Sequence, residues 1–308
     1  MTDGIERYLT RLYEVWTQLG KSTSVQLGFF VVLVGLTLAV RGRRAWSLRA
    51  TFGVLATVTL VHLNFMVMPF LKLLLAGAQG VYDGLGIPRL PVDFWAGVPT
   101  GIVAVVAVVA YDFANYWNHR LMHTPLLWPV HAIHHSDPDV SGMTTFRVHA
   151  LEPVVMVCSH VVLLTWLGLP ADALGPVGVF LILHNMYIHA DLDWTHGPLE
   201  LLVASPRFHR WHHADVPAHY GTNLANVIPL FDVAFGTYLV PGPCTAPLGA
   251  VGVPESNPLK LFLYPAVVWS QQLRGAVVAV VTGVGSALET SLEAAVRVAA
   301  LVPVRVRR

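Results

Sequence analysis

The chain has 308 residues, of which 55% are apolar and only 12% charged, and its formal net charge is +1. This apolar excess lies outside the usual composition of soluble globular proteins, and the near-zero charge excludes a basic surface for nucleic acid. The two cysteines, Cys158 and Cys244, form no CxxC pair, which excludes a disulfide framework and a thiolate metal site. The composition predicts an integral membrane protein.

The first third of the chain predicts a surface helix followed by two membrane spans. Residues 5–19 alternate charged and apolar side chains at helical spacing, as in an amphipathic helix on a membrane surface. No apolar signal core precedes them, so no cleaved leader is expected. Apolar stretches at 24–40 and 51–76 predict the two spans, and the Gly/Pro-rich residues 77–91 predict a loop or re-entrant piece.

Three more apolar stretches follow, at residues 98–116, 153–169 and 174–188, each near the ~20 residues that cross a bilayer. Further on, residues 259–273 predict an interfacial helix, and residues 275–302, which contain three charged side chains, predict a surface or packing helix. We therefore expect an all-α membrane bundle of four to five spans. Its expected regions are 1–97, 98–240 and 241–308.

The connection from Arg41 to Arg49 contains four arginines, and the positive-inside bias places it in the cytoplasm. From this loop the chain crosses the membrane in pairs of spans, so each later histidine-rich segment is expected on the cytoplasmic side as well. The bundle is thus expected to have a cytoplasmic, histidine-rich helical cap.

Fourteen of the 15 histidines lie between His119 and His219. They include four groups: His119/His123, His131/His134/His135, His184/His189 and His209/His212/His213. Residues at i, i+3 and i+4 share one helix face, so the HxxxH and HxxHH groups direct their imidazoles to one point. Pro129 and the pair Ser205-Pro206 are typical of helix starts just before two of these groups.

This clustering predicts metal binding. A lone histidine such as His62 or His160 is more simply a hydrogen-bonded core residue, but eight clustered imidazoles would cost several kcal/mol if buried without partners. Nitrogen-only ligation suits iron, zinc, copper or nickel. More than eight histidines exceed the needs of one ion, so two ions are expected, and a redox pair fits this surplus better than a structural zinc site.

The segments HRLMH, HAIHHSD, FRVHALE, HGPLE, SPRFHRWHH and PLFDVAFGTY stand in an order that resembles the fatty acid hydroxylase/sterol desaturase superfamily, in a bacterial-type member. The resemblance covers about residues 98–240 and implies a catalytic domain there, in an integral-membrane, non-haem di-iron enzyme. The chain departs from the family pattern at Asn223-Leu224-Ala225 and Phe231-Asp232, where the family tends to have Asn-(Tyr/Phe)-Gly and Trp-Asp.

The resemblance implies a defined ligand set. Its members are His119, His123, His131, His134, His135, His209, His212 and His213. It implies one further ligand, which we place at His189, with His184 as the alternative, and His149 resembles a position often kept among bacterial members. Ligating imidazoles usually donate their second N–H to a carboxylate or carbonyl. Candidates for this outer sphere are Asp112, Glu152, Asp191, Asp215 and Asp232, with the amides Asn115, Asn118 and Asn223, whereas Asp137, Asp139 and Asp193 are expected to cap turns or face water.

The function implied is O₂-dependent hydroxylation or desaturation of a fatty acyl, sterol-like or ether lipid taken from the bilayer, with two iron ions, O₂ as co-substrate and no catalytic residue beyond the metal centre. The chain has no flavin, nicotinamide, haem or iron–sulfur motif, so a separate reductase, ferredoxin or cytochrome must donate electrons. We expect the enzyme in a bacterial inner membrane or its equivalent, and the arginine-rich connection places its active site on the cytoplasmic face.

Three other functions remain as alternatives. A dizinc membrane hydrolase would activate water, but such sites usually include carboxylate ligands. A histidine-rich metal transporter would hold its ligands near the middle of the spans rather than at their ends. A di-haem electron carrier would use single histidines on facing helices, which the crowded HxxHH groups contradict.

Overall fold

The computed structural model describes residues 2–281, and no strand occurs among them apart from one isolated bridge between Ala214 and Leu248. The α-helices are α1 (Thr2–Arg41), α2 (Leu48–Phe65), α3 (Met68–Gly84), α4 (Thr100–Met122), α5 (Trp128–His135), α6 (Glu152–Leu167), α7 (Ala171–Ile188), α8 (Pro206–His212), α9 (Leu230–Phe235) and α10 (Pro258–Val281). Short 3₁₀ turns connect them: η1 (Arg43–Ala45), η2 (Val92–Trp95), η3 (Gly142–Phe146), η4 (Gly197–Leu199) and η5 (Pro217–His219). The predicted all-α class is confirmed for the described chain.

The amphipathic segment and the first apolar stretch form one helix, α1, rather than two elements. No proline interrupts residues 5–40, and isolated glycines cost a helix only ~1 kcal/mol each, so the helix continues. It ends at Arg41 because Gly42 takes a left-handed conformation with φ of 78°.

The second apolar stretch contains two helices, α2 and α3, separated at Met66 and Val67. Pro69 lies in the first turn of α3, where its missing N–H leaves no helical bond unmade. The prediction of a loop from residue 77 is wrong as far as Gly84, because α3 packs against α6 and this contact keeps Gly77 and Gly80 helical. The chain leaves the helix at Gly86, where φ is 62°.

Three described helical segments are long and apolar enough to cross a membrane: Thr23–Arg41, Leu48–Phe65 and Thr100–Met122. Large apolar side chains such as Val31, Phe52 and Val105 point outward from them, as lipid contact requires. The other two predicted spans correspond to α6 and α7, and the apolar part of α7, Ala173–Ile188, is shorter. The number of four to five spans stays a prediction.

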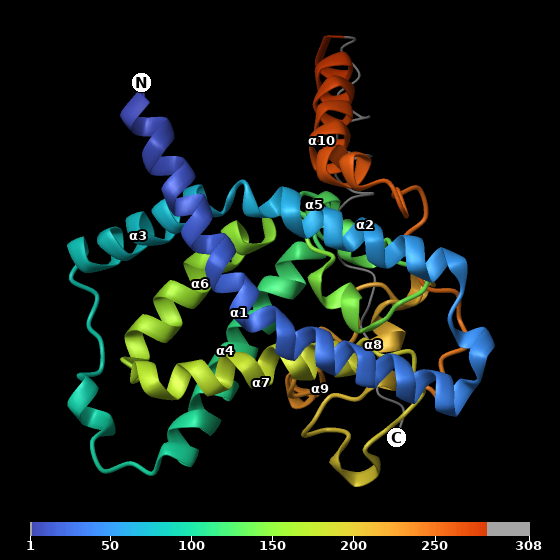
Figure 1. The fold of residues 1–308 in the computed structure, drawn as a ribbon, viewed down its shortest axis with the longest axis horizontal. Coiled ribbons are helices and arrows are strands. Elements are labelled where there is room, and N and C mark those ends of the chain that lie inside the picture. The colour runs from blue at the N-terminus through green and yellow to red at the C-terminus, as the bar shows by residue number, and fades with distance from the viewer. Residues whose placement is uncertain (1, 282–308) are drawn as a thin grey trace.

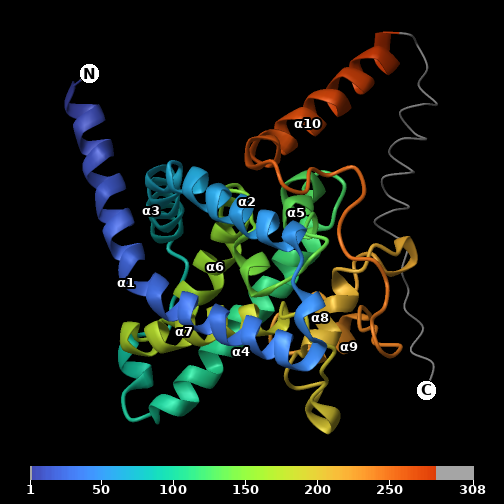
Figure 2. The same ribbon diagram turned by 45° about the vertical axis from the view of Figure 1, so that its right-hand side comes forward.

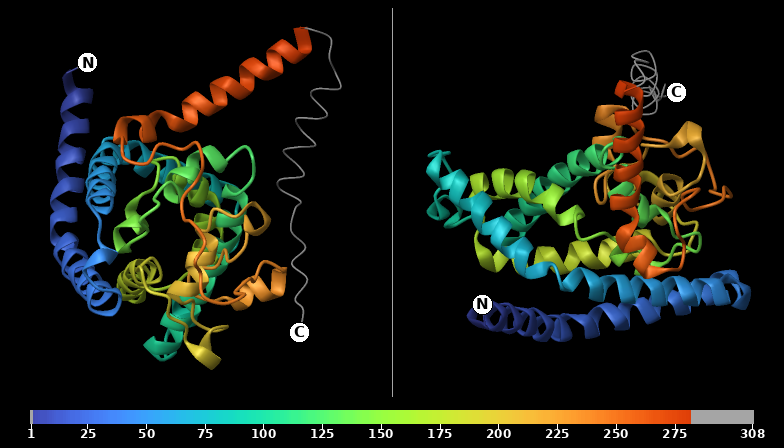
Figure 3. Two further views of the ribbon diagram at one scale, coloured as in Figure 1. Left: turned by 90° about the vertical axis from the view of Figure 1, so that its right-hand side faces the viewer. Right: turned by 90° about the horizontal axis from the view of Figure 1, so that it is seen from above.

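Helices α4, α6 and α7 pack against one another, and α3 packs on α6 (Figure 1). Helices α1 and α2 lie along one side of this group (Figure 3). The start of α10 packs on α2 and α5 around Leu60, Ile133 and Leu261, and the helix then projects away from the body (Figure 2). The predicted helix at 259–273 is part of α10, whereas most of the one predicted at 275–302 lies outside the described residues.

The connecting segments gather at two opposite ends of the bundle. At one end the α3–α4 connection meets the α6–α7 turn, where Leu90 donates its N–H to Trp166 O and the Trp95 indole donates to Leu167 O, both at 2.8 Å. The segments with histidine groups, including α5 and α8, lie away from this end (Figure 1).

Candidate metal centre

Local sequence signals place the histidine groups on helix ends. Helix α4 contains His119 and ends so that His123 caps it. Helix α5 has Pro129 in its first turn and ends at His135. Helix α8 starts after Ser205, whose hydroxyl accepts the N–H of Phe208 at 3.2 Å, with Pro206 as its first residue. These helix starts agree with the predicted ones.

The tertiary fold brings nine predicted histidines into two neighbouring groups. Their potential ligand atoms lie within 4.8 Å of one another in each group. The first group contains His119, His123, His131, His135 and His212, and the second contains His134, His189, His209 and His213. All nine imidazoles are buried except His123, which is half-buried. The groups adjoin, since the ring centroids of His135 and His213 are 4.6 Å apart. We call them the five-histidine and the four-histidine group.

Main-chain carbonyls fix the tautomers of three of these rings. Nδ1 of His119 lies 2.7 Å from Leu224 O, and Nδ1 of His212 lies 2.8 Å from Thr222 O. Nδ1 of His189 lies 2.7 Å from Asn185 O. A carbonyl only accepts, so each Nδ1 carries the proton and each Nε2 presents a lone pair to its group. This is the tautomer that binds a metal through Nε2.

The four-histidine group has more converging nitrogens than hydrogen bonds can satisfy. Nε2 of His189 lies 2.9 Å from His209 Nε2, 3.1 Å from His134 Nε2 and 3.2 Å from His213 Nε2. Its single lone pair can accept one hydrogen bond. The Nδ1 atoms of the three partner rings are buried without a protein partner. A cation between the Nε2 atoms would satisfy them together, so the residues fit a metal ion.

Burial also fixes the charge of these rings. It lowers the pKa of His131 to about 3 and that of His189 to about 4, because desolvation penalises the imidazolium. Desolvation also holds the pKa well below 6.5 for the other histidines of the two groups that lie outside the candidate membrane spans. These are His123, His134, His135, His209, His212 and His213. These side chains are neutral at pH 7, the form that ligates metals.

The sequence profile of the fatty acid hydroxylase family matches residues 104–237. This segment is a fatty acid hydroxylase domain. It contains all nine histidines of the two groups, and the resemblance seen in the motifs is confirmed over it.

Curated relatives match the same part of the chain. An ornithine lipid hydroxylase of Rhizobium tropici is 32% identical over 162 residues, covering 52% of this chain and 48% of that protein. The alkylglycerol monooxygenase of Homo sapiens is 30% identical over 135 residues, covering 43% and 29% of the two chains. Methylsterol monooxygenase 1 of Danio rerio is 27% identical over 138 residues, covering 40% and 44%. The chain thus spans about half the length of these relatives or less, and no solved structure matches it.

Two buried carboxylates of the hydroxylase domain hold the loop at residues 222–228. Asp112 accepts the backbone N–H groups of three successive residues from Asn226 to Ile228, at 2.7–3.1 Å. Asp232 accepts those of Leu224 and Ala225 at 2.6 and 2.9 Å. This loop supplies the carbonyls that orient His119 and His212. The two acids therefore act on the imidazoles through the main chain rather than by direct contact.

Asn223 lies in the same loop and is the one described non-glycine residue with a positive φ, 56°. Its amide donates to Phe208 O at 2.8 Å and to Leu239 O at 2.6 Å, and its Oδ1 accepts the N–H of Leu239 at 2.7 Å. Asparagine tolerates the left-handed region, and these bonds tie the loop to α8.

Glu152 and His149 lie beside the five-histidine group. Glu152 Oε1 is 3.4 Å from Nδ1 of His131, so this carboxylate faces a ring of the group. His149 uses both nitrogens elsewhere: Nε2 pairs with Phe262 O at 2.9 Å and Nδ1 accepts the N–H of Leu151 at 3.1 Å. His184 is also outside both groups, stacked on Phe180.

Among the described residues, no hydrogen bond or ion pair joins the remaining predicted polar residues to either group of imidazoles. Asp191 pairs with Arg41 and Arg210, and Asp215 accepts from Tyr220. Asn118 accepts the hydroxyl of Ser159 at 2.8 Å, and Asn115 is buried. As expected of turn-capping residues, Asp137 accepts the N–H of Asp139 at 3.2 Å, while Asp139 and Asp193 pair with Arg49 and Arg207.

Sequence reasoning missed two side chains that position the site. The Thr145 hydroxyl lies 3.2 Å from Nδ1 of His189. Arg147 is fully buried and donates to Ile133 O at 3.2 Å and to Ser136 Oγ at 3.0 Å, at the end of α5. The missed signal was the charge of Arg147 in the motif FRVHALE, since a buried arginine must satisfy its donors locally.

Proposed function

We propose that this chain is a membrane-bound di-iron oxygenase that hydroxylates a C–H bond of a lipid with O₂. The observation that carries the proposal is the pair of adjoining groups of neutral, buried imidazoles with Nε2 atoms converging in each. The fatty acid hydroxylase domain and the names of the relatives, a lipid hydroxylase and two monooxygenases, support hydroxylation over desaturation.

The reaction consumes the lipid C–H bond, O₂, two electrons and two protons, and gives an alcohol and water. Bound iron would supply the reduction of O₂ and the oxidation of the C–H bond. The nine histidines would hold the two ions, one in each group. The carbonyls of Thr222, Leu224 and Asn185 keep protons on Nδ1, and the loop held by Asp112 and Asp232 keeps two of these carbonyls in place. A reductase, ferredoxin or cytochrome would deliver the electrons.

We further propose that residues 98–240 form the catalytic domain, with the first two spans in 1–97 and the interfacial and packing helices in 241–308. The histidine groups would face the cytoplasm of a multi-pass protein in a bacterial inner membrane or equivalent. The four arginines between Arg41 and Arg49 support this orientation.

A dizinc hydrolase and a metal transporter are less well supported. Both groups consist entirely of imidazoles, without the carboxylate ligands usual in paired zinc hydrolases. Only His119 of the nine lies within a candidate span, near its end, whereas a transporter needs ligands along a path through the membrane.

Metal analysis of the purified full chain tests the proposal, together with oxygen uptake after addition of ferrous iron and lipid. We expect about two irons per chain and uptake that depends on lipid. Replacing His134 or His212 by Ala removes one ligand of one group, and should cost most of the metal in that group and the activity.

His62→Ala is the matched control, since His62 lies in α2, belongs to neither group and is exposed. It should retain metal and activity. Zinc in place of iron, or full iron content in both His134→Ala and His212→Ala, would contradict the assignment.

A further inference from the structure

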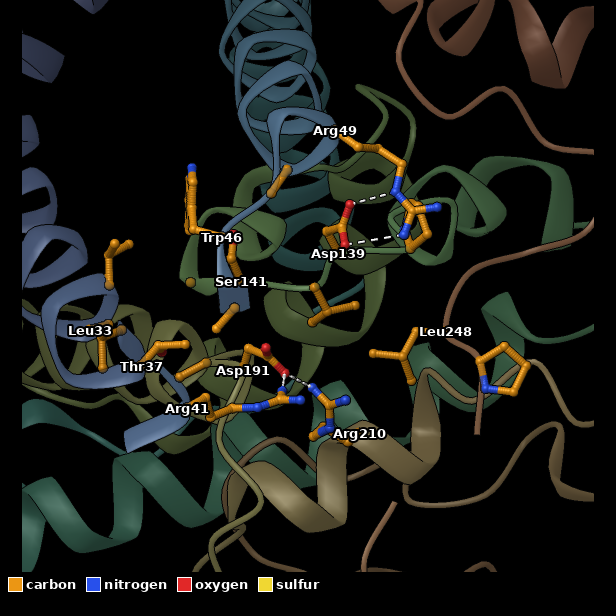
Figure 4. A pocket seen from close by; sticks show the side chains of 18 of the residues that line it. Leu33, Thr37, Arg41, Trp46, Arg49, Asp139, Ser141, Asp191, Arg210 and Leu248 are labelled. Carbon is orange, nitrogen blue, oxygen red and sulfur yellow. Dashed lines mark hydrogen bonds and ion pairs between the residues drawn. The ribbon is translucent and has the colours of Figure 1, made fainter. Parts of the chain in front are cut away.

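A cavity of about 340 Å³ lies beside the metal centre, at the end of α1. Its wall comes from six separate parts of the chain: the end of α1, the η1 turn with the start of α2, residues 138–142, residues 190–191, Arg210, and residues 246–248. Figure 4 shows these side chains facing a common space. No histidine of the two groups lines it.

The cavity combines three arginines with two aspartates. Arg41 and Arg210 both pair with Asp191, and Arg49 binds Asp139 through two bonds of 2.7 and 3.2 Å (Figure 4). The formal charge of the wall is therefore +1. Arg210 forms the buried side of the cavity, with 11% of its side chain exposed, whereas Arg41 and Arg49 on the rim are 45% and 61% exposed. The rim guanidiniums retain free donors for an anion.

The place of the cavity suits an amphiphile. Arg41 ends one candidate span and Arg49 starts the next, so the arginines lie at the level where spans leave the apolar core of a bilayer. Leu33, Val34 and Leu248 give the cavity an apolar side as well. Anionic lipid headgroups are attracted to basic residues at this level, and guanidinium matches the geometry of phosphate oxygens.

The cavity also adjoins the metal centre through the chain itself. Asp191 and Ala190 directly follow His189, and Arg210 directly follows His209, both in the four-histidine group. The cavity wall therefore contains residues that are one or two positions along the chain from two proposed metal ligands.

We propose that this cavity binds the phosphate-bearing headgroup of an anionic lipid and so selects the substrate. This rests on the proposed function, because only a lipid-oxidising enzyme needs the headgroup beside its metals. The bound phosphate takes its hydrogen bonds from Arg49 and Arg41 and competes with Asp139 and Asp191 for them.

Binding to the purified full chain in a neutral detergent tests the proposal. The probes are a short-chain phosphatidate, the diacylglycerol with the same chains, and inorganic phosphate. We expect the phosphatidate to bind about tenfold more tightly than the diacylglycerol, with the difference shrinking at high salt. Inorganic phosphate should bind far more weakly than the phosphatidate, because it lacks the apolar part.

Two substitutions with opposite expected effects on phosphatidate affinity distinguish a role in lipid binding from a purely structural role. Arg49→Gln removes a donor and should weaken phosphatidate binding about fivefold, whereas Asp139→Asn removes the competing carboxylate and should strengthen it. A purely structural ion pair would make both variants weaker. Arg89→Gln is the matched control, since Arg89 pairs with Asp83 outside the cavity and its loss should leave binding unchanged.

Equal affinity for phosphatidate and diacylglycerol would overturn the proposal, as would weaker binding in Asp139→Asn. Inorganic phosphate binding as tightly as phosphatidate would show a site for the free anion and overturn it too. The assay needs no turnover, so it is independent of the enzymatic proposal. Iron content and oxygen uptake in the same preparations show whether the oxygenase assignment fails on its own.

Discussion

Single imidazoles in the metal centre depend on main-chain oxygen atoms. His119, His189 and His212 each place Nδ1 against a carbonyl, at 2.7–2.8 Å. The carbonyls that face His119 and His212 belong to the loop at residues 222–228, and Asp112 and Asp232 hold this loop by accepting its backbone N–H groups. Asp112 and Asp232 thus fix the orientation of the His119 and His212 rings through the main chain, without placing their own negative charge next to these imidazoles.

His189 and His184 should differ sharply when replaced by Ala. Five residues on a helix correspond to about 500°, which leaves the two side chains about 140° apart. His189 lies in the four-histidine group, whereas His184 lies against Phe180 outside it. We expect His189→Ala to lose metal and activity together, and His184→Ala to keep most of its metal.

Metal content per chain, measured on both variants purified in parallel, gives the comparison. Equal losses would mean that His184 also ligates, which requires the end of α7 to unwind when the metal binds.

Among the secondary-structure elements, those with local signals could be predicted and those set by packing could not. The starts of α5 and α8 follow from Pro129 and from Ser205-Pro206, and the structure has them there. The second half of α3 was not predicted, because Gly77 and Gly80 suggest a loop and only the contact with α6 shows that they are helical. The roles of Leu224 O and Thr222 O could not be predicted, since a carbonyl has no sequence signature and its partner lies 105 or 10 residues away.

The turn between α6 and α7 should not tolerate a side chain at Gly168. This residue caps α6 with φ of 55°, and a Cβ there would overlap the carbonyl oxygen of Leu90. The same region ties the α3–α4 connection to α6 through the bond from Leu90 to Trp166 O. We expect Gly168→Ala to lower stability by more than about 2 kcal/mol, seen as a lower Tm of the detergent-solubilised protein.

Gly178→Ala is the matched control for this change. Gly178 lies within α7, and a Cβ there meets no atom within 4 Å. Alanine in a helix interior should leave Tm unchanged or raise it, by up to about 1 kcal/mol in stability. Similar losses in both variants would show that the Leu90 contact does not matter.

For the molecule as a whole, the buried imidazoles should make the metal-free protein sensitive to acid. Burial lowers the pKa of the rings, for example to about 3 in His131, whereas the unfolded chain binds protons near pH 6.5. A lowered folded-state pKa contributes stability above pH 6.5 that is lost as the pH falls below it. Each ring that stays neutral in the folded state while it binds a proton in the unfolded chain adds to this loss.

Urea unfolding of chelator-treated protein at pH 8 and pH 5.5 should therefore show a large loss of stability at the lower pH. The double variant His134→Asn/His135→Asn has two fewer such rings and should show a shallower slope. Stability that stays constant between the two pH values would contradict the neutral, buried state of the groups.

The two ends of the bundle also determine how it can lie in a membrane. The α3–α4 connection and the α6–α7 turn meet around Trp95, Val103 and Ala173, while the histidine groups lie near the other ends of α4 and α7. Arg41 and Arg49, at the two ends of the arginine-rich connection, line the cavity beside the histidine groups. If that end is cytoplasmic, the first end must be on the opposite side of the membrane.

Single-cysteine labelling in intact cells tests this orientation. In a background without Cys158 and Cys244, Ala96→Cys and Ala218→Cys place one exposed thiol at each end, before α4 and after α8. A membrane-impermeant maleimide should label Ala96→Cys in intact cells and reach Ala218→Cys only after the membrane is opened. These labels would be reversed if the histidine groups faced outward. Labelling of both thiols in intact cells would mean that α4 does not cross the bilayer, because α4 is the candidate span that separates the two positions.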